Sequence, residues 1–155
     1  MSRAACSSLT LTIRPARNAA EIDDAAALYV RSGQASFTWR APEHFRAEDF
    51  RMFALDEEVW LAFLGNAVVG ILSIFREESF IHCLYVDPDA QRLGVGRALV
   101  AHVRRIAGGP LTLKLDVPNR RAIRFYEATG WTRMTGLDDQ GVDEFGITWA
   151  RYRLA

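Results

Sequence analysis

Cysteine, long apolar runs and an excess of charge of one sign are scarce or missing in this sequence of 155 residues. The two cysteines, Cys6 and Cys83, are too few for a disulfide framework. No apolar run approaches the roughly eighteen residues of a membrane-spanning helix, and no signal-peptide pattern is recognisable. Nineteen basic and nineteen acidic residues give a net charge of zero, which argues against nucleic-acid binding through bulk positive charge. We therefore expect a soluble, cytoplasmic protein whose partners include neither a membrane nor a nucleic acid.

Metal-binding and nucleophile motifs are also lacking. The three histidines are scattered and no Cys-x-x-Cys pair occurs, so we expect no metal site. No serine or cysteine stands in a recognisable catalytic context with histidine and aspartate. The chain has no Gly-Lys-Ser/Thr triplet, and Leu99 occupies the third glycine position of the dinucleotide fingerprint. These absences argue against a metal site, a covalent nucleophile, a Walker A loop and a Rossmann fingerprint.

The composition is that of a globular protein, because half of the residues are hydrophobic and a quarter are charged. A chain of this length is long enough to bury a core and suits one domain. We find no repeat, low-complexity segment or linker. Residues 1–155 are therefore expected to form a single domain, in which residues 1–8 are a flexible tail.

Hydrophobic periodicity predicts the order of the elements. Alternating apolar residues indicate strands, and apolar residues at three- and four-residue spacing between caps and glycines indicate helices. The expected elements, in order, are a strand over 9–13, a helix from Asn18 to Gly33, a helical stretch from Pro42 to about Leu55, strands over 59–64, 68–74 and 80–86, a helix from Gly94 to Gly108, a strand over 111–117, a helix from Asn119 to Gly130, and strands over 131–135 and 147–154 with a turn at 138–141. The order β-α-α-β-β-β-α-β-α-β-β predicts an α/β fold with a mixed sheet.

The most informative stretch joins the strand over 80–86 to the helix that follows it. Asp87-Pro88-Asp89 stops the strand, and Gly94 and Gly96 precede a helix whose apolar face repeats at helical spacing. The N-terminus of a helix presents unpaired N–H groups and a partial positive charge, so it attracts phosphate. Glycine allows close approach of a ligand to the backbone.

The pattern Gln91-x-x-Gly94-x-Gly96-Arg97 after a strand resembles the pyrophosphate-binding motif of the GCN5-related N-acetyltransferase (GNAT) superfamily. A second segment, with Asn119, Phe125-Tyr126 and Gly130-Trp131, is also similar to this superfamily, although Trp131 stands where phenylalanine is usual. The expected order of elements matches the superfamily over residues 9–154. The resemblance implies transfer of an acetyl group from acetyl-CoA directly to a primary amine.

The resemblance also implies which residues bind acetyl-CoA. Backbone groups of Leu84 and Val86 would hold the pantetheine arm, and the Leu84 N–H would polarise the thioester carbonyl as an oxyanion hole does. Residues 92–97 would surround the pyrophosphate, and Asn119 would bind the pantetheine arm. The full set is Leu84, Tyr85, Val86, Gln91, Arg92, Leu93, Gly94, Val95, Gly96, Arg97, Asn119 and Tyr126.

Two residues are candidates for proton transfer. Tyr126 stands where many members place the general acid that protonates the departing thiolate; alternatively, it is a core aromatic. The usual position of a glutamate base on the strand over 80–86 is occupied by Phe80, which cannot accept a proton. His82, two residues on, should share its strand face and is a candidate base, acting directly or through an ordered water. The alternative for His82 is a satisfied, half-buried histidine.

The sequence does not identify the acceptor, and three hypotheses about the function remain open. Aromatic residues gathered between positions 29 and 60 favour a pocket for a small amine, although they also suit core packing. The acidic residues that could meet an ammonium group are Glu43, Glu48, Asp49, Asp143 and Glu144, although charged residues of this kind commonly form a solvated surface. The first hypothesis is a small-molecule N-acetyltransferase, the second a protein or peptide amine acetyltransferase, and the third a noncatalytic acyl-CoA-binding sensor. Similar proteins often form homodimers, so a homodimer is also an open expectation.

Overall fold

The computed structural model describes residues 10–155, so the expected tail over 1–8 and the first residue of the expected strand over 9–13 lie outside the described residues. The elements are β1 Leu11–Pro15, α1 Ala19–Ser36, α2 Ala47–Asp56, β2 Glu58–Leu64, β3 Ala67–Phe75, β4 Phe80–Val86, α3 Val95–Ala107, β5 Leu111–Asp116, α4 Arg120–Ala128, β6 Thr132–Arg133, β7 Gln140–Val142 and β8 Thr148–Leu154. This order confirms the predicted one, with β7 added.

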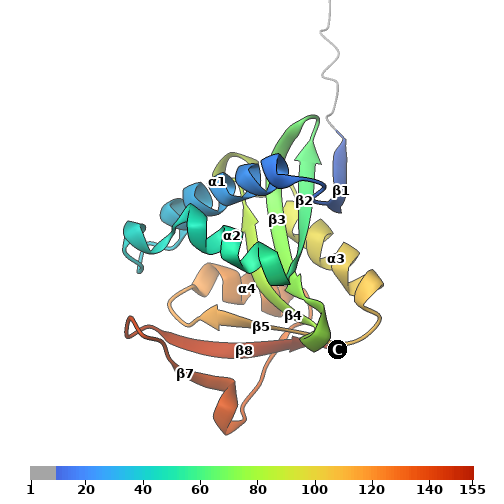
Figure 1. Ribbon diagram of the computed structural model, residues 1–155. Coiled ribbons are helices and arrows are strands. Elements are labelled where there is room, and N and C mark those ends of the chain that lie inside the picture. The colour runs from blue at the N-terminus through green and yellow to red at the C-terminus, as the bar shows by residue number, and fades with distance from the viewer. Residues whose placement is uncertain (1–9) are drawn as a thin grey trace, which may run out of the picture.

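The strands form one mixed sheet in the order β1-β2-β3-β4-β5-β8-β6, and β7 also pairs with β8. Apolar residues of α1 and α2 pack in one core, and apolar residues of α3 and α4 pack in another. Figure 1 shows α1 and α2 together over β2 to β4, and α4 beside β5. The predicted α/β fold is confirmed.

The central feature of the sheet is the separation of β4 from β5. These strands are parallel, as strands joined through a crossover helix are, but they pair only at Phe80–Thr112 and Ile81–Leu113. Every other ladder around them is antiparallel and longer. Beyond Ile81 the facing backbone edges of β4 and β5 therefore have no partner in the sheet, and a gap opens toward their carboxyl ends.

A β-bulge changes the direction of side chains in β4. Ile81 pairs with Ile74 and Cys83 pairs with Ser73, so His82 is the extra residue. Ile81 consequently packs in the core of α3 and α4, whereas Cys83 packs in the core of α1 and α2. Without the bulge, strict alternation would place His82 opposite Cys83 and Tyr85. With the bulge, Cys83 and Tyr85 lie on the same face as His82, and α1 and α2 cover this face.

Some predicted boundaries were wrong. The first helix continues past Gly33 to Ser36, because this glycine makes room for a neighbour rather than ending the helix. Pro42 begins a separate 3₁₀ turn that ends at His44, before α2. The expected end of β1 before Pro15 was also wrong, since Pro15 pairs with Trp60 on the edge of the sheet, where a missing N–H is tolerated.

The C-terminal segment differs from prediction in two strands. The strand expected over 131–135 is reduced to Thr132–Arg133, and the expected turn at 138–141 contains a 3₁₀ turn followed by β7. Three residues of polar or small character carry no period-two signal, so β7 could not be recognised from the pattern. Its pairing with β8 closes the hairpin that borders the site.

Candidate active site

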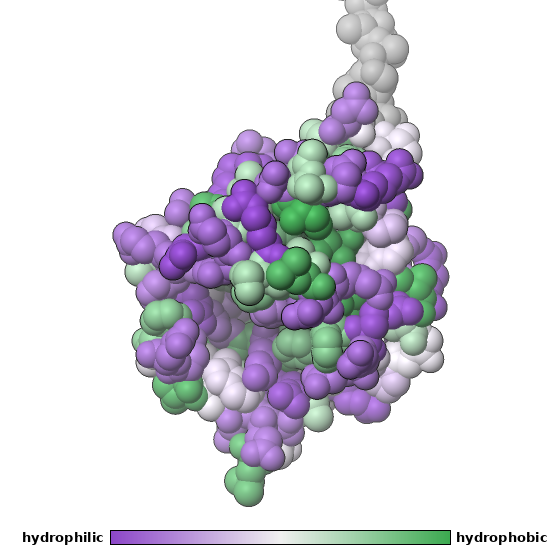
Figure 2. Space-filling view, in the orientation of Figure 1, coloured by the Kyte–Doolittle hydropathy of each residue, from purple (hydrophilic) through white to green (hydrophobic). Residues whose placement is uncertain are grey.

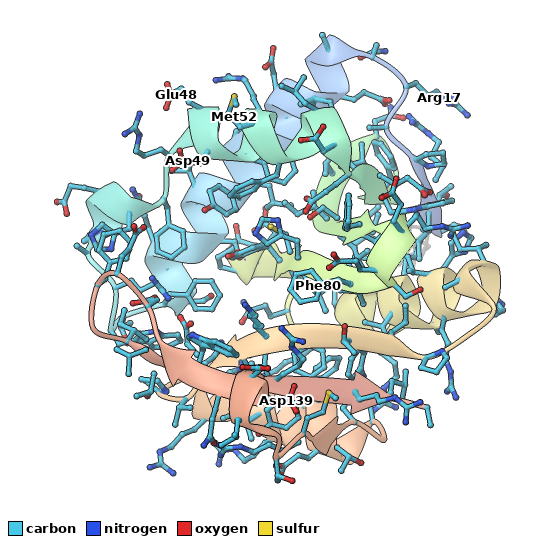
Figure 3. All side chains as sticks on the ribbon, turned by 60° about the horizontal axis from the view of Figure 1, so that its bottom comes forward. Arg17, Glu48, Asp49, Met52, Phe80 and Asp139 are labelled. Atoms are coloured by element: carbon cyan, nitrogen blue, oxygen red, sulfur yellow. The ribbon has the colours of Figure 1, made fainter. Side chains whose placement is uncertain are left out.

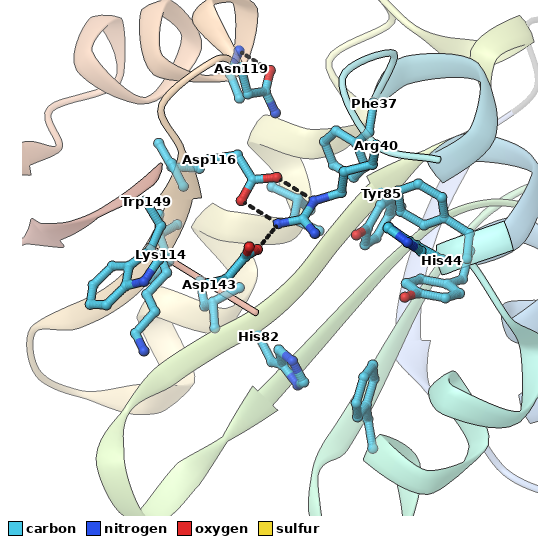
Figure 4. Close-up of a pocket in the computed structure, with 18 of the residues that line it drawn as sticks. Phe37, Arg40, His44, His82, Tyr85, Lys114, Asp116, Asn119, Asp143 and Trp149 are labelled. Carbon is cyan, nitrogen blue, oxygen red and sulfur yellow. Dashed lines mark hydrogen bonds and ion pairs between the residues drawn. The ribbon is translucent and has the colours of Figure 1, made fainter. Parts of the chain in front are cut away.

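A cleft of about 700 Å³ follows the gap between β4 and β5. Its walls come from α1, the α1–α2 connection, β4, β5, α4 and the β7–β8 turn (Figure 4). Five of the residues predicted from the sequence line it: His82, Leu84, Tyr85, Asn119 and Tyr126. Segments far apart in the sequence therefore bring these five residues into one cavity, whereas Val86 and residues 91–97 are not part of its lining.

The backbone at the end of β4 faces this gap. The Asp87 N–H donates to the Val69 carbonyl at 2.8 Å, so Asp87 and Tyr85 turn their hydrogen-bonding groups toward β3. By the alternation of an antiparallel ladder, Leu84 and Val86 turn theirs toward β5, whose pairing has already ended. The Val86 carbonyl accepts a hydrogen bond from the Ser32 hydroxyl at 2.9 Å. The Leu84 N–H has no strand to pair with on its side.

The N-terminus of α3 carries unpaired donors. Gly94 adopts a left-handed conformation with φ of 77° and provides no side-chain cap. The first intrahelical bond is from Ala98 N–H to the Gly94 carbonyl, which leaves the N–H groups of residues 95–97 without intrahelical acceptors. A Cβ at Gly96 would lie 3.6 Å from Val86 Cγ2, an ordinary contact, so packing within the protein does not require glycine there.

Other residues of the loop lie at or near the surface. Arg92, Leu93 and Arg97 are exposed, and Arg92 adopts a positive φ of 69°. Arg97 lines a separate hollow of about 500 Å³ beside Phe125. The side-chain amide of Gln91 points toward α1, where it donates to the Ser36 hydroxyl at 3.4 Å. The loop thus presents backbone donors and two guanidinium groups, whereas the Gln91 side chain is directed to α1.

Asn119 and Tyr126 enter the cleft from α4. The Asn119 side-chain oxygen caps the helix by accepting from Ala122 N–H at 3.1 Å, so its amide nitrogen is left for the cleft. Tyr126 is only 5% exposed, and its ring packs edge-on against Trp131. Burial raises the pKa of the Tyr126 phenol, so this group is a neutral donor at physiological pH. Core aromatic and cleft residue are therefore both correct descriptions of Tyr126.

His82 is held by two residues at the end of α2. Its Nδ1 lies 2.7 Å from Glu57 Oε1, and its ring centroid lies 4.2 Å from that of Phe53. Phe80 is on the same side, with a centroid distance of 6.3 Å, as predicted from their spacing. Sequence analysis missed Glu57, because nothing local to residues 56–58 indicates that this carboxylate reaches β4.

A charged bridge crosses the cleft. Arg40 donates to both oxygens of Asp116, at 2.7 and 2.9 Å, and to Asp143 at 2.7 Å. Trp39 Nε1 donates to the same Asp116 carboxylate at 2.9 Å. These contacts join the α1–α2 connection to the end of β5 and to the β7–β8 turn (Figure 4). Sequence analysis missed Arg40 and Asp116, which lie in segments without diagnostic spacing.

Further charges and rings surround the bridge. Lys114 lies 4.2 Å above the Trp149 ring, and His44 stacks on Phe145 with a centroid distance of 3.9 Å. Asp49 and Glu144 also line the cleft. Acidic side chains outnumber basic ones on this lining, which favours a cationic group near the bridge.

Residues 10–155 were also considered for a membrane span and for a metal site. No helix within this range is long and apolar enough to cross a membrane. Within the same range, no group of three or more histidine, cysteine, aspartate or glutamate residues could hold a metal ion.

Comparison with known proteins identifies the family. The model of the acetyltransferase (GNAT) family matches residues 9–131. The chain belongs to this family. It is 29% identical to peptidyl-lysine N-acetyltransferase YjaB of Escherichia coli K12 over 150 residues, covering 95% of this chain and 97% of the relative. It is also 33% identical to the E. coli ribosomal protein bS18-alanine N-acetyltransferase, covering 44% of this chain and 49% of the relative.

Solved structures of GNAT proteins share the fold. The solution structure of apo YjaB from E. coli matches with a TM-score of 0.77 and 22% identity, covering 95% of this chain and 99% of the other. The PaiA N-acetyltransferase of Thermoplasma acidophilum, solved with coenzyme A, matches with a TM-score of 0.74 and 13% identity, covering 94% and 99%. The predicted family and fold are confirmed. The protein is an N-acetyltransferase that uses acetyl-CoA as co-substrate and an amine as acceptor.

Proposed function

We propose that this GNAT enzyme acetylates the primary amine of a small molecule in the cleft between β4 and β5. The observation that carries the proposal is the opening of the sheet beyond Ile81, where the Leu84 N–H, Tyr126 and His82 meet one cavity. A thioester carbonyl seated beside an unpaired backbone donor would be polarised as in an oxyanion hole. Of the two residues proposed for proton transfer, His82 enters the cleft from β4 and Tyr126 enters it from α4.

The co-substrate would lie along the backbone of β4 and the start of α3. Leu84, Tyr85 and Val86 would line the pantetheine arm, with the amide of Asn119 donating from α4. The N–H groups of residues 95–97 and the guanidinium groups of Arg92 and Arg97 would hold the pyrophosphate. Leu93 and Gly94 shape this loop. Gln91 would act through its contact with α1.

Direct transfer requires that the amine lose a proton and that the thiolate gain one. His82 would take the proton from the ammonium group, directly or through one water. It lies two residues before Leu84 on β4, a span of roughly 6.5 Å, so an amine beside the thioester carbonyl would be within reach of the imidazole or of a bridging water. The free amine attacks the carbonyl carbon, an N–C bond forms and the C–S bond breaks. Tyr126 would donate its phenolic proton to the departing sulfur and regain one from solvent. The products are the N-acetylated amine and free coenzyme A.

The cleft supports a small acceptor. Arg40, Asp116 and Asp143 form a bridge across it, so the space beside the reacting carbonyl is bounded. Tyr29, Phe37 and other rings form its apolar wall. An apolar amine with one ammonium group would match aromatic walls and carboxylates at once.

A protein acceptor is the second candidate, and α2 favours it. Met52 and Leu55 are 63% and 75% exposed. Figure 2 shows apolar residues over α2 on a mainly hydrophilic face, and Figure 3 shows Met52 on the outer side of that helix. Because Asp49 and Phe53 of α2 line the cleft, a peptide could lie across this helix with a lysine side chain inserted. The relative YjaB is named for peptidyl-lysine acetylation.

An acetyl-CoA-dependent thiol-release assay over amines, amino acids, aminoglycosides and peptides tests the proposal. We expect release with one class of small amines, and Tyr126→Phe should lower kcat at least about tenfold while acetyl-CoA affinity stays nearly unchanged. Release only with peptides would select the second candidate. Binding of acetyl-CoA without turnover on any amine would contradict both and favour the noncatalytic sensor. Unchanged turnover in Tyr126→Phe would remove this residue from the mechanism.

Three expectations about the surroundings of the enzyme are also proposals. We infer a cytoplasmic enzyme, a homodimer and no interaction with nucleic acid or membranes, from the composition and zero net charge of the chain and from its resemblance to a family whose members often form homodimers. Cell fractionation, sedimentation velocity and co-sedimentation with vesicles or DNA test them. A monomer at micromolar concentration would contradict the homodimer.

A further inference from the structure

We propose that Glu57 is the positioning residue for His82: it fixes the imidazole with Nδ1–H toward the carboxylate and Nε2 toward the cleft. This inference rests on the proposed role of His82 in amine deprotonation. It concerns the C-cap residue of α2, which does not line the cleft itself.

The local backbone explains how Glu57 reaches β4. Glu57 ends α2 in an extended conformation, and its N–H donates to the Phe53 carbonyl at 3.1 Å. Phe53 and Glu57 are therefore adjacent on the last turn, and both contact His82. Phe53 covers one face of the ring, and the Glu57 carboxylate meets Nδ1 at 2.7 Å. Strand β4 supplies the other half of the contact, because His82 shares the face of Phe80 and points toward α2.

The burial of the pair is unequal. The Glu57 side chain is 10% exposed, whereas that of His82 is 35% exposed. Oε2 of Glu57 is buried and has no hydrogen-bond partner among residues 10–155. A carboxylate that served only to join α2 to β4 would gain more from a fully satisfied site, since a buried acceptor without a partner costs stability. The position of this buried carboxylate beside an exposed imidazole is better explained if the carboxylate serves to orient the imidazole.

The arrangement has a defined chemical consequence. Hydrogen bonding of Nδ1–H to a carboxylate selects the neutral tautomer whose Nε2 lone pair is free. Nε2 would accept the proton of the incoming ammonium group, and Glu57 would stabilise the imidazolium that forms. The proton leaves to solvent after the N–C bond has formed, which restores the neutral ring.

Other charged groups also face this part of the cleft. Asp49 extends from α2, Lys114 from β5, and Asp143 and Glu144 from the β7–β8 turn. Within residues 10–155, the acidic residue that pairs with His82 is Glu57. Glu57 is therefore the residue whose substitution tests how this imidazole is positioned.

Kinetics of Glu57→Gln and Glu57→Ala test the proposal, with Glu58→Gln as the matched control. Glu58 is the next residue, is exposed and pairs with Arg76. We expect Glu57→Ala to lower kcat about 10- to 100-fold at neutral pH, with the KM for acetyl-CoA within about twofold. Glu57→Gln keeps a side-chain oxygen that can accept from Nδ1–H, so it should lower kcat less than Glu57→Ala. Glu58→Gln should match the wild type in kcat and in the KM for acetyl-CoA.

A double variant and a tautomer measurement separate this inference from the proposed function. Glu57→Ala should cost little further activity in a His82→Gln background, because both residues act in one step. Fully additive losses would overturn the proposal. Side-chain nitrogen NMR, assigned with His82→Gln, should show the Nδ1–H tautomer in the wild type and its loss in Glu57→Ala. An Nε2–H tautomer in the wild type would overturn the proposal even if the enzyme is active. A wild-type Nδ1–H tautomer without turnover on any amine would instead overturn the proposed function, and with it this role.

Discussion

The packing of Phe45 explains why a glycine, Gly33, lies inside helix α1. A Cβ at Gly33 would lie 2.2 Å from Cδ1 of the Phe45 ring, which is 6% exposed. We expect Gly33→Ala to lower the free energy of unfolding by about 1–3 kcal/mol, because a rigid buried ring must shift. Urea denaturation measures this. Gly109→Ala is the control, since no atom lies within 4 Å of its Cβ and its φ is not positive; equal stability of the two variants would contradict the explanation.

Glu21 couples stability to acid pH through one carboxylate. It accepts hydrogen bonds from Arg14 and from the Arg17 N–H, which lower its pKa to about 2. Because the pKa is lower in the folded state, the stabilisation is present above the unfolded pKa of about 4.3 and is lost as pH falls toward 2. The Glu21 N–H in turn donates to the side-chain oxygen of Asn18, which caps α1 as predicted.

Glu21→Gln should therefore have a lower melting temperature than the wild type at pH 7. The difference should shrink between about pH 4.5 and pH 2, since the wild-type carboxylate becomes neutral over this interval. Glu77→Gln, which changes an exposed carboxylate in a 3₁₀ turn, is the control. A difference that is independent of pH would show that the charge of Glu21 is not responsible.

At the same scale, the sequence located the candidate base better than its surroundings. Alternation from Phe80 was enough to place His82 on the correct face, although only the bulge keeps Cys83 there as well. Glu57 could not be predicted, because its contact depends on where α2 ends relative to β4. Asn119 was predicted from its cap signal, and that same cap determines which of its atoms remains available.

At the scale of elements, the Arg40 bridge ties the α1–α2 connection, which is not part of the sheet, to the end of β5 and to the β7–β8 turn. The side chains of Arg40, Asp116 and Asp143 are 17%, 19% and 24% exposed, so water screens the charges only in part. Arg40→Met would leave two carboxylates without their partner. We expect it to lower the free energy of unfolding by about 1–3 kcal/mol and to raise the KM for the amine more than the KM for acetyl-CoA.

Urea denaturation and steady-state kinetics measure the two effects of Arg40→Met. Proteolysis within residues 137–147 should also become faster, because Asp143 anchors this turn. Arg46→Met is the matched control: Arg46 belongs to the same connection, is exposed and pairs only distantly with Glu48, at 3.8 Å. Proteolysis at the same rate in both variants would contradict the anchoring role of Arg40.

Element prediction succeeded where a local signal exists and failed where pairing decides. Gly108 ends α3 in the left-handed conformation, as its position predicted. By contrast, β6 and β7 exist only because β8 offers an edge to both. The parallel pairing of β4 and β5 is expected from the helix between them, but no local signal in the sequence shows that it stops after two residue pairs.

At the scale of the whole molecule, the gap in the sheet predicts how acetyl-CoA affects unfolding. Strands β4 and β5 are joined by two residue pairs, and the Arg40 bridge links the α1–α2 connection to β5. A ligand bound along this gap contacts both sides in the folded state alone. At 100 times its Kd it should add about 2.7 kcal/mol, which corresponds to a rise in Tm of roughly 5–10 °C for a chain of this size.

Differential scanning calorimetry with and without acetyl-CoA measures this effect, and an equal concentration of AMP, which lacks the pantetheine arm, is the control. Because we expect one domain, a single transition should move as a unit. Two transitions, of which only one moves, would show that the segment from β5 to β8 unfolds separately. No shift with acetyl-CoA would contradict binding along the gap, since any ligand that favours the folded state must raise the temperature at which it unfolds.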